Sequence, residues 1–264
     1  MTSTTPFRIA VDGGVLVGER TGGEDGVPLV MVHGFGGSRG DWEAVTQALP
    51  AAIPTLTYDQ RGFGETYSEE GHAFSHAEDL LALLDALDIA RVDLCGMSLG
   101  GSTVLGCTLA APERIRRLVL VSPMLGGWSW SAEWVDLWKA IGRAARGGSM
   151  AQARALWFDH PLFATVREGP HADVLQQQIA AFAGQQWIRD DQLPERPMAE
   201  RLSDINTPTL LFTGGLDWPD FRIMADRIEH ALPNVQRIDD PAAGHMLTIE
   251  RPAEIAAAIS AFVA

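Results

Sequence analysis

Short apolar runs alternate with longer amphipathic stretches along most of this 264-residue chain. From residue 29 onward the runs are almost continuously apolar, which is typical of strands that are covered on both faces of a parallel sheet. We expect strands at residues 7–11, 15–20, 29–33, 55–58, 91–95, 117–121, 209–213 and 235–239. We expect helices at residues 42–49, 75–87, 99–111, 220–232 and 253–263. This alternation predicts an α/β fold in which helices connect parallel strands, while the first two strands form an antiparallel hairpin.

The strand pattern is interrupted between residues 123 and 206, where helix-forming residues dominate. We expect this segment to be a helical cap inserted into a core made by residues 1–122 and 207–264. The segment holds six of the eight tryptophans, and Trp130, Trp134 and Trp138 recur at helical spacing on one face. Such a stripe either packs the cap onto the core or lines an apolar substrate pocket, and the two interpretations are compatible.

One serine lies at the expected turn between a buried strand and a helix. It belongs to the pentapeptide Gly96-Met97-Ser98-Leu99-Gly100, which follows the apolar strand at residues 91–95. A residue on such a turn has a strained backbone and an accessible side chain, and we expect the two glycines to keep neighbouring atoms away from the hydroxyl. The pentapeptide therefore indicates Ser98 as a nucleophile.

A serine hydroxyl becomes a good nucleophile only beside a general base that a third group orients. His245 is the candidate base, because it follows the last expected strand on a loop of small residues. Asp217 is the candidate acid, since it follows the strand at residues 209–213 after two glycines that allow a sharp turn. Asp220 is the reserve candidate, although its position also suits the start of the next helix.

Acyl transfer needs hydrogen-bond donors at the place where negative charge develops on the carbonyl oxygen. The segment His33-Gly34-Phe35-Gly36-Gly37 follows a buried strand and can expose backbone amides with little side-chain obstruction. We expect the N–H groups of Phe35 and Leu99 to form this oxyanion hole. A glycine-rich loop can also hold a phosphate, but no Gly-x-Gly-x-x-Gly or Walker pattern is present, so we expect no cofactor.

These motifs, in this order, resemble those of the α/β-hydrolase superfamily: His33-Gly34, Asp59-Gln60-Arg61-Gly62-Phe63-Gly64, the serine pentapeptide, Asp217 and His245. The resemblance extends over essentially the whole chain. It implies an eight-stranded, mostly parallel sheet whose second strand is antiparallel, with a helical cap over the strand ends. In this family the turn that holds Asp59 and Arg61 is usually architectural, so we place neither residue in the site.

The composition limits the classes of partner that we expect this chain to bind. The formal net charge of −14 argues against nucleic-acid and anionic-membrane surfaces, because both favour clustered Lys and Arg. No segment reaches the roughly 18 apolar residues of a membrane span, and residues 1–6 show no signal peptide, so we expect a cytoplasmic protein, as monomer or homodimer. Cys95 and Cys107 lack metal-ligand spacing, so we expect free thiols and no metal.

Together, these residues predict a serine hydrolase that cleaves carboxylic esters through an acyl-enzyme intermediate. The Trp-rich segment and the low positive charge favour small to medium, uncharged, apolar substrates. The candidate substrate-binding residues are Met124, Trp128, Trp130, Trp134 and Met246.

Several other activities fit the same triad. A lactonase, including an enol-lactone hydrolase, a thioesterase and a cofactor-free perhydrolase are all alternatives. C–C bond hydrolases resemble the chain in size, but they typically carry Ser-Gly-Pro-Gly where this sequence has Gly34-Phe35-Gly36-Gly37. The non-enzymatic alternative is a receptor that keeps the triad and binds a small ligand without turnover.

Overall fold

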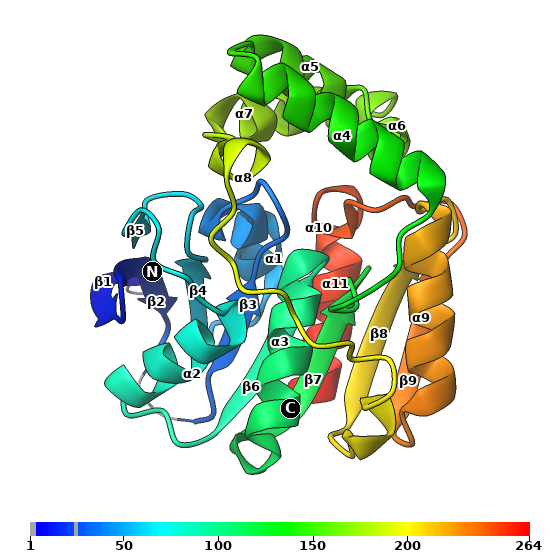
Figure 1. Ribbon diagram of the computed structural model, residues 1–264. Helices are drawn as coiled ribbons and strands as arrows, with labels where there is room; N and C mark the ends of the chain where they lie inside the picture. Colours follow the sequence, from blue (N-terminus) through cyan, green and yellow to red (C-terminus); the bar gives the residue numbers. More distant parts are fainter. Residues whose placement is uncertain (1–3, 24–25) are drawn as a thin grey trace.

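The chain folds around one sheet that carries helices on both faces (Figure 1). The computed structural model describes residues 4–23 and 26–264, so residues 1–3, where we expected no signal peptide, lie outside the described residues. The main strands lie in the order β1-β2-β4-β3-β6-β7-β8-β9. The strands are β1 (Thr4–Val11), β2 (Gly14–Thr21), β3 (Leu29–Val32), β4 (Thr55–Asp59), β5 (Tyr67–Ser68), β6 (Val92–Met97), β7 (Ile115–Val121), β8 (Thr209–Gly214) and β9 (Val235–Asp240).

The strand directions confirm a mostly parallel sheet with an antiparallel second strand. β2 pairs antiparallel with both β1 and β4, whereas the neighbours from β4 to β9 pair parallel. The expected count of eight is exceeded by β5, whose two residues pair with Gly14 and Val15 of β2. A two-residue strand is too short to leave an alternating pattern, so the sequence did not predict it.

The five expected helices begin and end within a few residues of the expected positions, whereas a short helix at Leu247–Glu250 was not predicted. The core helices are α1 (Glu43–Ala48), α2 (His76–Ala86), α3 (Leu99–Ala110), α9 (Pro219–Ala231), α10 (Leu247–Glu250) and α11 (Pro252–Val263). Single 3₁₀ turns are η1 (Arg39–Trp42), η2 (Pro112–Arg114), η3 (Pro161–Phe163) and η4 (Leu202–Asp204). The helix expected at residues 42–49 is therefore divided, with a 3₁₀ turn that ends at Trp42 followed by α1.

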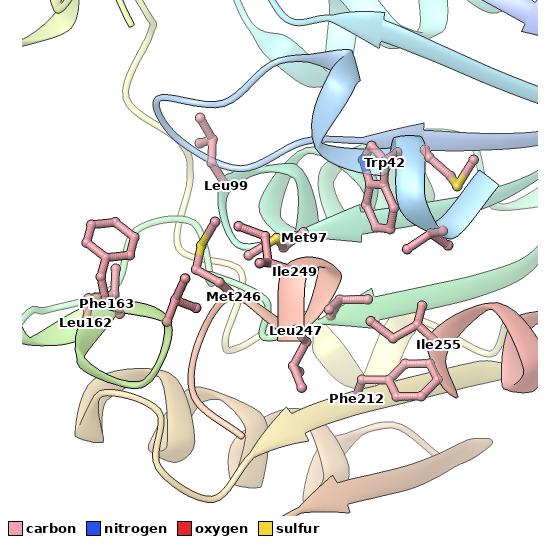
Figure 2. Close-up of a cluster of buried hydrophobic side chains, with 14 of the residues drawn as sticks. Trp42, Met97, Leu99, Leu162, Phe163, Phe212, Met246, Leu247, Ile249 and Ile255 are labelled. Carbon is pink, nitrogen blue, oxygen red and sulfur yellow. The ribbon is translucent and has the colours of Figure 1, made fainter. Parts of the chain in front are cut away.

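Two hydrophobic clusters fill the two sides of the sheet. Because side chains alternate along a strand, Leu29 and Met31 of β3 belong to one cluster, while Val30 and Val32 belong to the other. The first cluster extends from α11 to the helices that follow β7, and Figure 2 shows part of it. Residues of the later helical segment therefore pack directly onto the side of the sheet that holds α1 and α11.

The connection between β7 and β8 consists of helices above the carboxyl ends of the central strands (Figure 1). These are α4 (Ala132–Arg146), α5 (Met150–Phe158), α6 (Ala164–Arg167), α7 (Ala172–Ala181) and α8 (Gln185–Ile188). Ser131 caps α4, because its hydroxyl accepts a hydrogen bond from the Trp134 N–H at 3.3 Å. All of residues 123–206 are described, and they form no strand apart from one bridge between Gln192 and Phe74.

Both cysteines are buried and free, as the sequence predicted. Burial raises the pKa of the Cys95 thiol and raises that of Cys107 to about 12. Among the described residues, none of the helices combines the length and the apolar character needed to cross a membrane.

Candidate active site

Ser98 lies at a sharp turn between β6 and α3. Its φ of 52° and ψ of −116° are strained for a residue with a side chain, and neighbouring segments hold this conformation in place. The Ser98 N–H donates to the Val121 carbonyl at 3.1 Å, and the Ser98 carbonyl accepts from the N–H groups of Gly101 and Met124 at 2.9 Å. The turn therefore fixes the direction of the serine side chain before any ligand binds.

The two glycines of the pentapeptide have a different role from the one we expected. A Cβ at Gly96 would overlap the carbonyl of Gly100, and a Cβ at Gly100 would overlap the carbonyl of Val32. Both glycines thus allow α3 to approach β3 and β6 closely, which is a packing requirement. It is Gly34 that leaves room beside the serine, since a Cβ there would lie 3.2 Å from Ser98 Cβ.

His245 and Asp217 form a buried pair on the loops that follow β9 and β8. The Nδ1 atom of His245 lies 3.0 Å from both carboxylate oxygens of Asp217, and the side chains are almost completely buried. Asp217 also accepts the N–H of Trp218 at 2.6 Å, which orients the carboxylate. With the Nδ1 hydrogen donated to Asp217, the Nε2 atom of a neutral imidazole is an acceptor, as a general base requires.

Ser98 and His245 line the same cavity, which has a volume of about 390 Å³. In the described part of the chain, no hydrogen bond joins Ser98 Oγ to the imidazole, so the serine–histidine contact of an assembled triad is not made. Contacts of this type are often long in the absence of substrate and shorten in the complex. The structure brings the three predicted residues to one place and joins two of them directly.

The expected oxyanion residues also line this cavity, which we call the site cavity. Leu99 is the first residue of α3, and the N–H groups of a helix's first turn have no partner within the helix. Phe35 follows Gly34 on the loop beside Ser98. Both N–H groups thus come from segments that border the serine.

The wall of the site cavity opposite the sheet is built largely of tryptophan. The rings of Trp130 and Trp134 stack with centroids 4.2 Å apart, and Trp134 is nearly parallel to Trp138 at 6.5 Å. Trp157 meets Trp138 edge-on at 5.7 Å. All four line the cavity, so a ligand there contacts large apolar surfaces.

Four of the five candidate substrate-binding residues line the site cavity: Met124, Trp130, Trp134 and Met246. Trp128 does not, and this corrects the expectation. Its indole N–H donates to Asp220 at 3.0 Å, which turns the ring toward α9. Spacing alone could not separate Trp128 from Trp130, because both precede α4 on an irregular segment.

Asp220, the reserve candidate for the acid, anchors the start of the helical segment. Its carboxylate accepts hydrogen bonds from the indoles of Trp128 and Trp218 and from the N–H and hydroxyl of Ser131, at 2.6–3.1 Å. Burial opposes the charged form, but these hydrogen bonds outweigh it and lower the pKa of Asp220. Asp220 is thus bonded to Trp128, Trp218 and Ser131, whereas Asp217 is bonded to His245.

Sequence reasoning missed the polar side chains of the site cavity, which include Asp41, Gln178, Asp190, Gln192 and Lys139. Burial raises the pKa of Asp41 to about 7. These residues come from distant segments, and no local motif marks them. Within residues 4–23 and 26–264, no three His, Cys, Asp or Glu side chains gather to hold a metal ion.

Comparisons with known proteins identify the class. A family model described as the alpha/beta hydrolase fold matches residues 27–252, and the chain belongs to this family. In the described part of the chain, the sheet order and the serine turn agree with that assignment.

Particular relatives cover most of the chain. A putative carbamate hydrolase, RutD, of Pseudomonas syringae is 30% identical over 249 residues, which are 90% of this chain and 94% of that protein. The 3-oxoadipate enol-lactonase 1 of Acinetobacter baylyi is 26% identical over 92% of this chain and 90% of its own. A further match, 40% identical, covers 44% of this chain and only 32% of the dihydrolipoyllysine-residue acetyltransferase component of the acetoin cleaving system of Pseudomonas putida.

Among solved structures, carboxylesterase CesB of Bacillus subtilis aligns with a TM-score of 0.82 and 22% identity. The alignment covers 99% of this chain and 92% of that one, and it shows a shared fold. Family membership and these relatives together support a hydrolase.

Proposed function

We propose that this protein is a serine hydrolase that cleaves carboxylic esters through an acyl-enzyme intermediate. Ser98 is the nucleophile, His245 the general base and Asp217 the acid that orients the imidazole. The observation that carries the proposal is the combination of the strained Ser98 turn with a histidine in the same cavity whose Nδ1 atom is bound to a carboxylate.

The steps follow from this arrangement. Ser98 Oγ attacks the ester carbonyl carbon while its proton passes to Nε2 of His245. The carbonyl oxygen becomes negative and accepts hydrogen bonds from the N–H groups of Phe35 and Leu99. The carbon–oxygen bond to the leaving group breaks, and the alcohol departs with the proton from His245. Water then attacks the acyl-enzyme through the same base, which releases the acid and restores Ser98.

The site cavity supports small to medium, uncharged, apolar substrates. Its volume of about 390 Å³ lies near the lower end of ordinary ligand pockets, and tryptophans form much of its wall. Lys139 is the one Lys or Arg among the described lining residues and is exposed, while Asp41 and Asp190 are acidic. We propose that α4–α8, within residues 123–206, act as a cap that supplies this apolar wall and reduces access of water.

A lactonase is the second candidate, because a relative named 3-oxoadipate enol-lactonase matches along 90% of its length. The same triad opens a lactone, with the hydroxyl leaving group remaining attached to the acyl product. An enol-lactone of 3-oxoadipate keeps a free carboxylate, whereas the described lining offers one Lys and two acidic residues, Asp41 and Asp190. The lining therefore favours an uncharged lactone over this anionic one.

Turnover of p-nitrophenyl acetate, butyrate and octanoate, measured beside γ-butyrolactone and δ-valerolactone, tests the proposal. The esters should be hydrolysed, and Ser98→Ala should lower kcat by about 10⁶-fold. Ser102→Ala is the matched control, because this serine lies one turn along α3 with its hydroxyl bonded to Glu195. A fluorophosphonate should lose fluoride to the serine and leave its phosphonyl group on the wild type and on Ser102→Ala, which the intact mass reports. Absence of both turnover and adduct in the wild type would leave the receptor alternative.

A further inference from the structure

The direction of the Phe35 N–H is set by the carbonyl of the preceding residue. The Gly34–Phe35 peptide is trans, so the Phe35 N–H points opposite to the Gly34 carbonyl. That carbonyl lies 2.7 Å from Nδ1 of His33, and it also accepts the N–H of Gly37 at 3.2 Å. Any group that holds the His33 ring therefore also aims the Phe35 N–H.

His33 has one possible tautomer in this position. The backbone N–H of Gln60 donates to Nε2 of His33 at 3.0 Å, and a backbone N–H can only donate. The ring hydrogen must therefore lie on Nδ1, where it is donated to the Gly34 carbonyl. The ring is completely buried, and this burial lowers the pKa of His33, which keeps the imidazole neutral.

The side chain of Gln60 extends this arrangement to the second expected oxyanion donor. Its Nε2 donates to the His33 carbonyl at 2.8 Å, and its Oε1 accepts the hydroxyl of Thr103 at 2.7 Å. Thr103 lies on α3, four residues after Leu99, so it belongs to the next turn of the same helix face. One buried amide thus connects the loop that carries the Phe35 N–H to the helix that begins with the Leu99 N–H.

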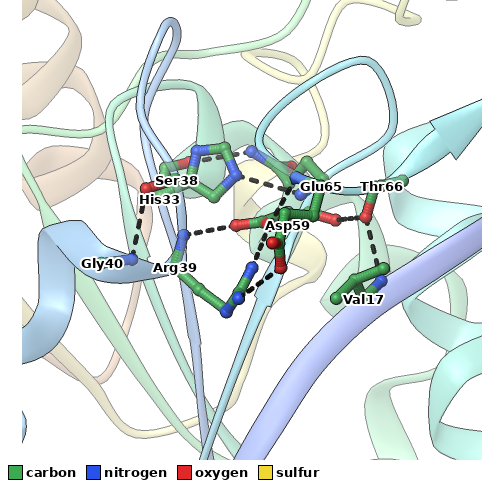
Figure 3. A network of polar contacts seen from close by, with 9 residues as sticks. Val17, His33, Ser38, Arg39, Gly40, Asp59, Glu65 and Thr66 are labelled. Carbon is green, nitrogen blue, oxygen red and sulfur yellow. Dashed lines mark hydrogen bonds and ion pairs between the residues drawn. The ribbon is translucent and has the colours of Figure 1, made fainter. Parts of the chain in front are cut away.

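The residue before Gln60 holds the far end of the same loop. The Asp59 carboxylate accepts the Arg39 backbone N–H at 2.7 Å and also binds its guanidinium, as Figure 3 shows. Figure 3 also shows His33 beside this network, at the beginning of the loop. Residues 34–38 are therefore tied to one turn at both ends, and Gln60 holds the end nearer Ser98.

We propose that Gln60 and Thr103 are positioning residues that fix the Phe35 and Leu99 N–H groups relative to each other. This inference rests on the proposed function, because it concerns the oxyanion formed from Ser98. Donors held in advance need no reorganisation when negative charge develops. Neither Gln60 nor Thr103 lines the site cavity, so binding of the uncharged ester does not depend on them.

Thr103→Val provides the sharpest test, since it replaces the buried hydroxyl with a methyl group of similar size. Thr103→Ser keeps the hydroxyl, and Gln60→Leu removes both amide contacts. Thr108→Val is the matched control, because this buried threonine lies on the same helix and, among the described residues, its hydroxyl bonds the Val104 carbonyl alone. For each variant, kcat and KM are measured with p-nitrophenyl butyrate, together with the Ki of an alkyl trifluoromethyl ketone, which forms an oxyanion with the serine.

Thr103→Val should lower kcat by about 10- to 100-fold with an unchanged KM, since a displacement of about 1 Å costs up to about 100-fold. The Ki of the ketone should rise by the same factor, because the inhibitor resembles the transition state. Thr103→Ser should recover most of the kcat, and Thr108→Val should match the wild type. An unchanged kcat in Thr103→Val, or a loss confined to KM, would overturn the inference. A wild type without turnover or ketone binding would instead overturn the proposed function.

Discussion

The side-chain amide of Gln178 donates a hydrogen bond to Oδ1 of Asp41 at 3.1 Å and thereby joins α7 to η1, the 3₁₀ turn after β3. Both residues line the site cavity and also a second hollow, of about 870 Å³, which Arg39 and Glu43 border as well. The pair therefore lies in the wall that the two spaces share. The other Asp41 oxygen packs against Gly37, where a Cβ would overlap it.

Asp41→Asn should change how stability depends on pH. Burial raises the folded-state pKa of Asp41 to about 7, well above the value of an unfolded aspartate. Between those two values the folded state holds a proton that the unfolded state releases, so the wild type loses stability as pH rises from about 4 to 7. Asparagine cannot ionise, and its oxygen still accepts from Gln178.

The free energy of unfolding, measured by urea titration at pH 5, 6, 7 and 8, checks this expectation. The difference in unfolding free energy between Asp41→Asn and the wild type should grow in favour of the variant by roughly 2–3 kcal/mol between pH 5 and 7, at about 1.36 kcal/mol per pKa unit, and then level off. Gln178→Leu is the companion variant, since it removes the partner and leaves the carboxyl group. Parallel pH profiles for Asp41→Asn and the wild type would contradict the assignment.

Asp217→Asn and Asp220→Asn form a matched pair that separates the two candidate acids. In Asp217→Asn the histidine can no longer donate its Nδ1 hydrogen to a carboxylate, which disfavours the tautomer needed at Nε2. We expect kcat to fall by about 10⁴-fold while KM changes little.

Asp220→Asn should instead lower the melting temperature, because Asp220 holds Trp128, Trp218 and Ser131. Its kcat should stay within a few-fold of the wild-type value. Steady-state kinetics of both variants with p-nitrophenyl butyrate show which of the two aspartates the reaction requires. A larger loss of kcat in Asp220→Asn than in Asp217→Asn would reverse the assignment.

Trp138→Ala should move the ester preference toward longer acyl chains. The ring of Trp138 lines the site cavity and meets Phe35 edge-on, with centroids 5.0 Å apart, so its removal opens space beside the oxyanion loop. Each methylene that fills apolar space contributes about 0.8 kcal/mol. The ratio of kcat/KM for octanoate to that for acetate should therefore rise about tenfold or more.

Trp128→Phe is the control for this change, because Trp128 is another tryptophan near α4 that does not line the site cavity. Its octanoate-to-acetate ratio should equal that of the wild type. If both variants shift the ratio equally, the shift is caused by a change in the mobility of the helical segment. Trp138 would then not be the part of the cavity wall that limits the acyl chain.

Local sequence patterns predicted much of the fold and the positions of the three candidate residues. A buried apolar strand, a glycine-bounded serine and a helix specify the Ser98 turn over a few residues, and Asp217 and His245 each follow a strand on a short loop. Because parallel strands end at one edge of the sheet, such loops meet there without further information.

Contacts between distant segments could not be predicted in this way. Trp128 is hydrogen-bonded to Asp220, 92 positions later in the sequence, and Asp41 is hydrogen-bonded to Gln178, 137 positions later. The turn with Asp59 was assigned an architectural role from the resemblance alone, and its neighbour Gln60 carries no motif that points to Thr103. Packing of the helical segment on the core decides these contacts, and one sequence does not encode them as a local pattern.

His160 should make the protein sensitive to acid. Its ring is buried among Trp134, Trp157 and Trp218, and its Nδ1 accepts the Leu162 N–H at 3.1 Å. Burial, with smaller effects from His245 and Arg167, lowers the pKa of His160 to about 4. Between about 6.5 and 4 the unfolded state binds a proton that the folded state does not, so stability is lost as pH falls through this window.

His160→Asn keeps an acceptor for the Leu162 N–H but does not titrate, so its unfolding free energy should fall less steeply between pH 6.5 and 4.5 than that of the wild type. Over this interval the unfolding free energy of the wild type should fall by roughly 2 kcal/mol more than that of His160→Asn, even if loss of the ring lowers the stability of the variant at pH 7. His171→Asn, at an exposed position before α7, is the matched control and should leave the wild-type acid dependence in place. Equal slopes for His160→Asn and the wild type would mean that folding does not lower the pKa of His160.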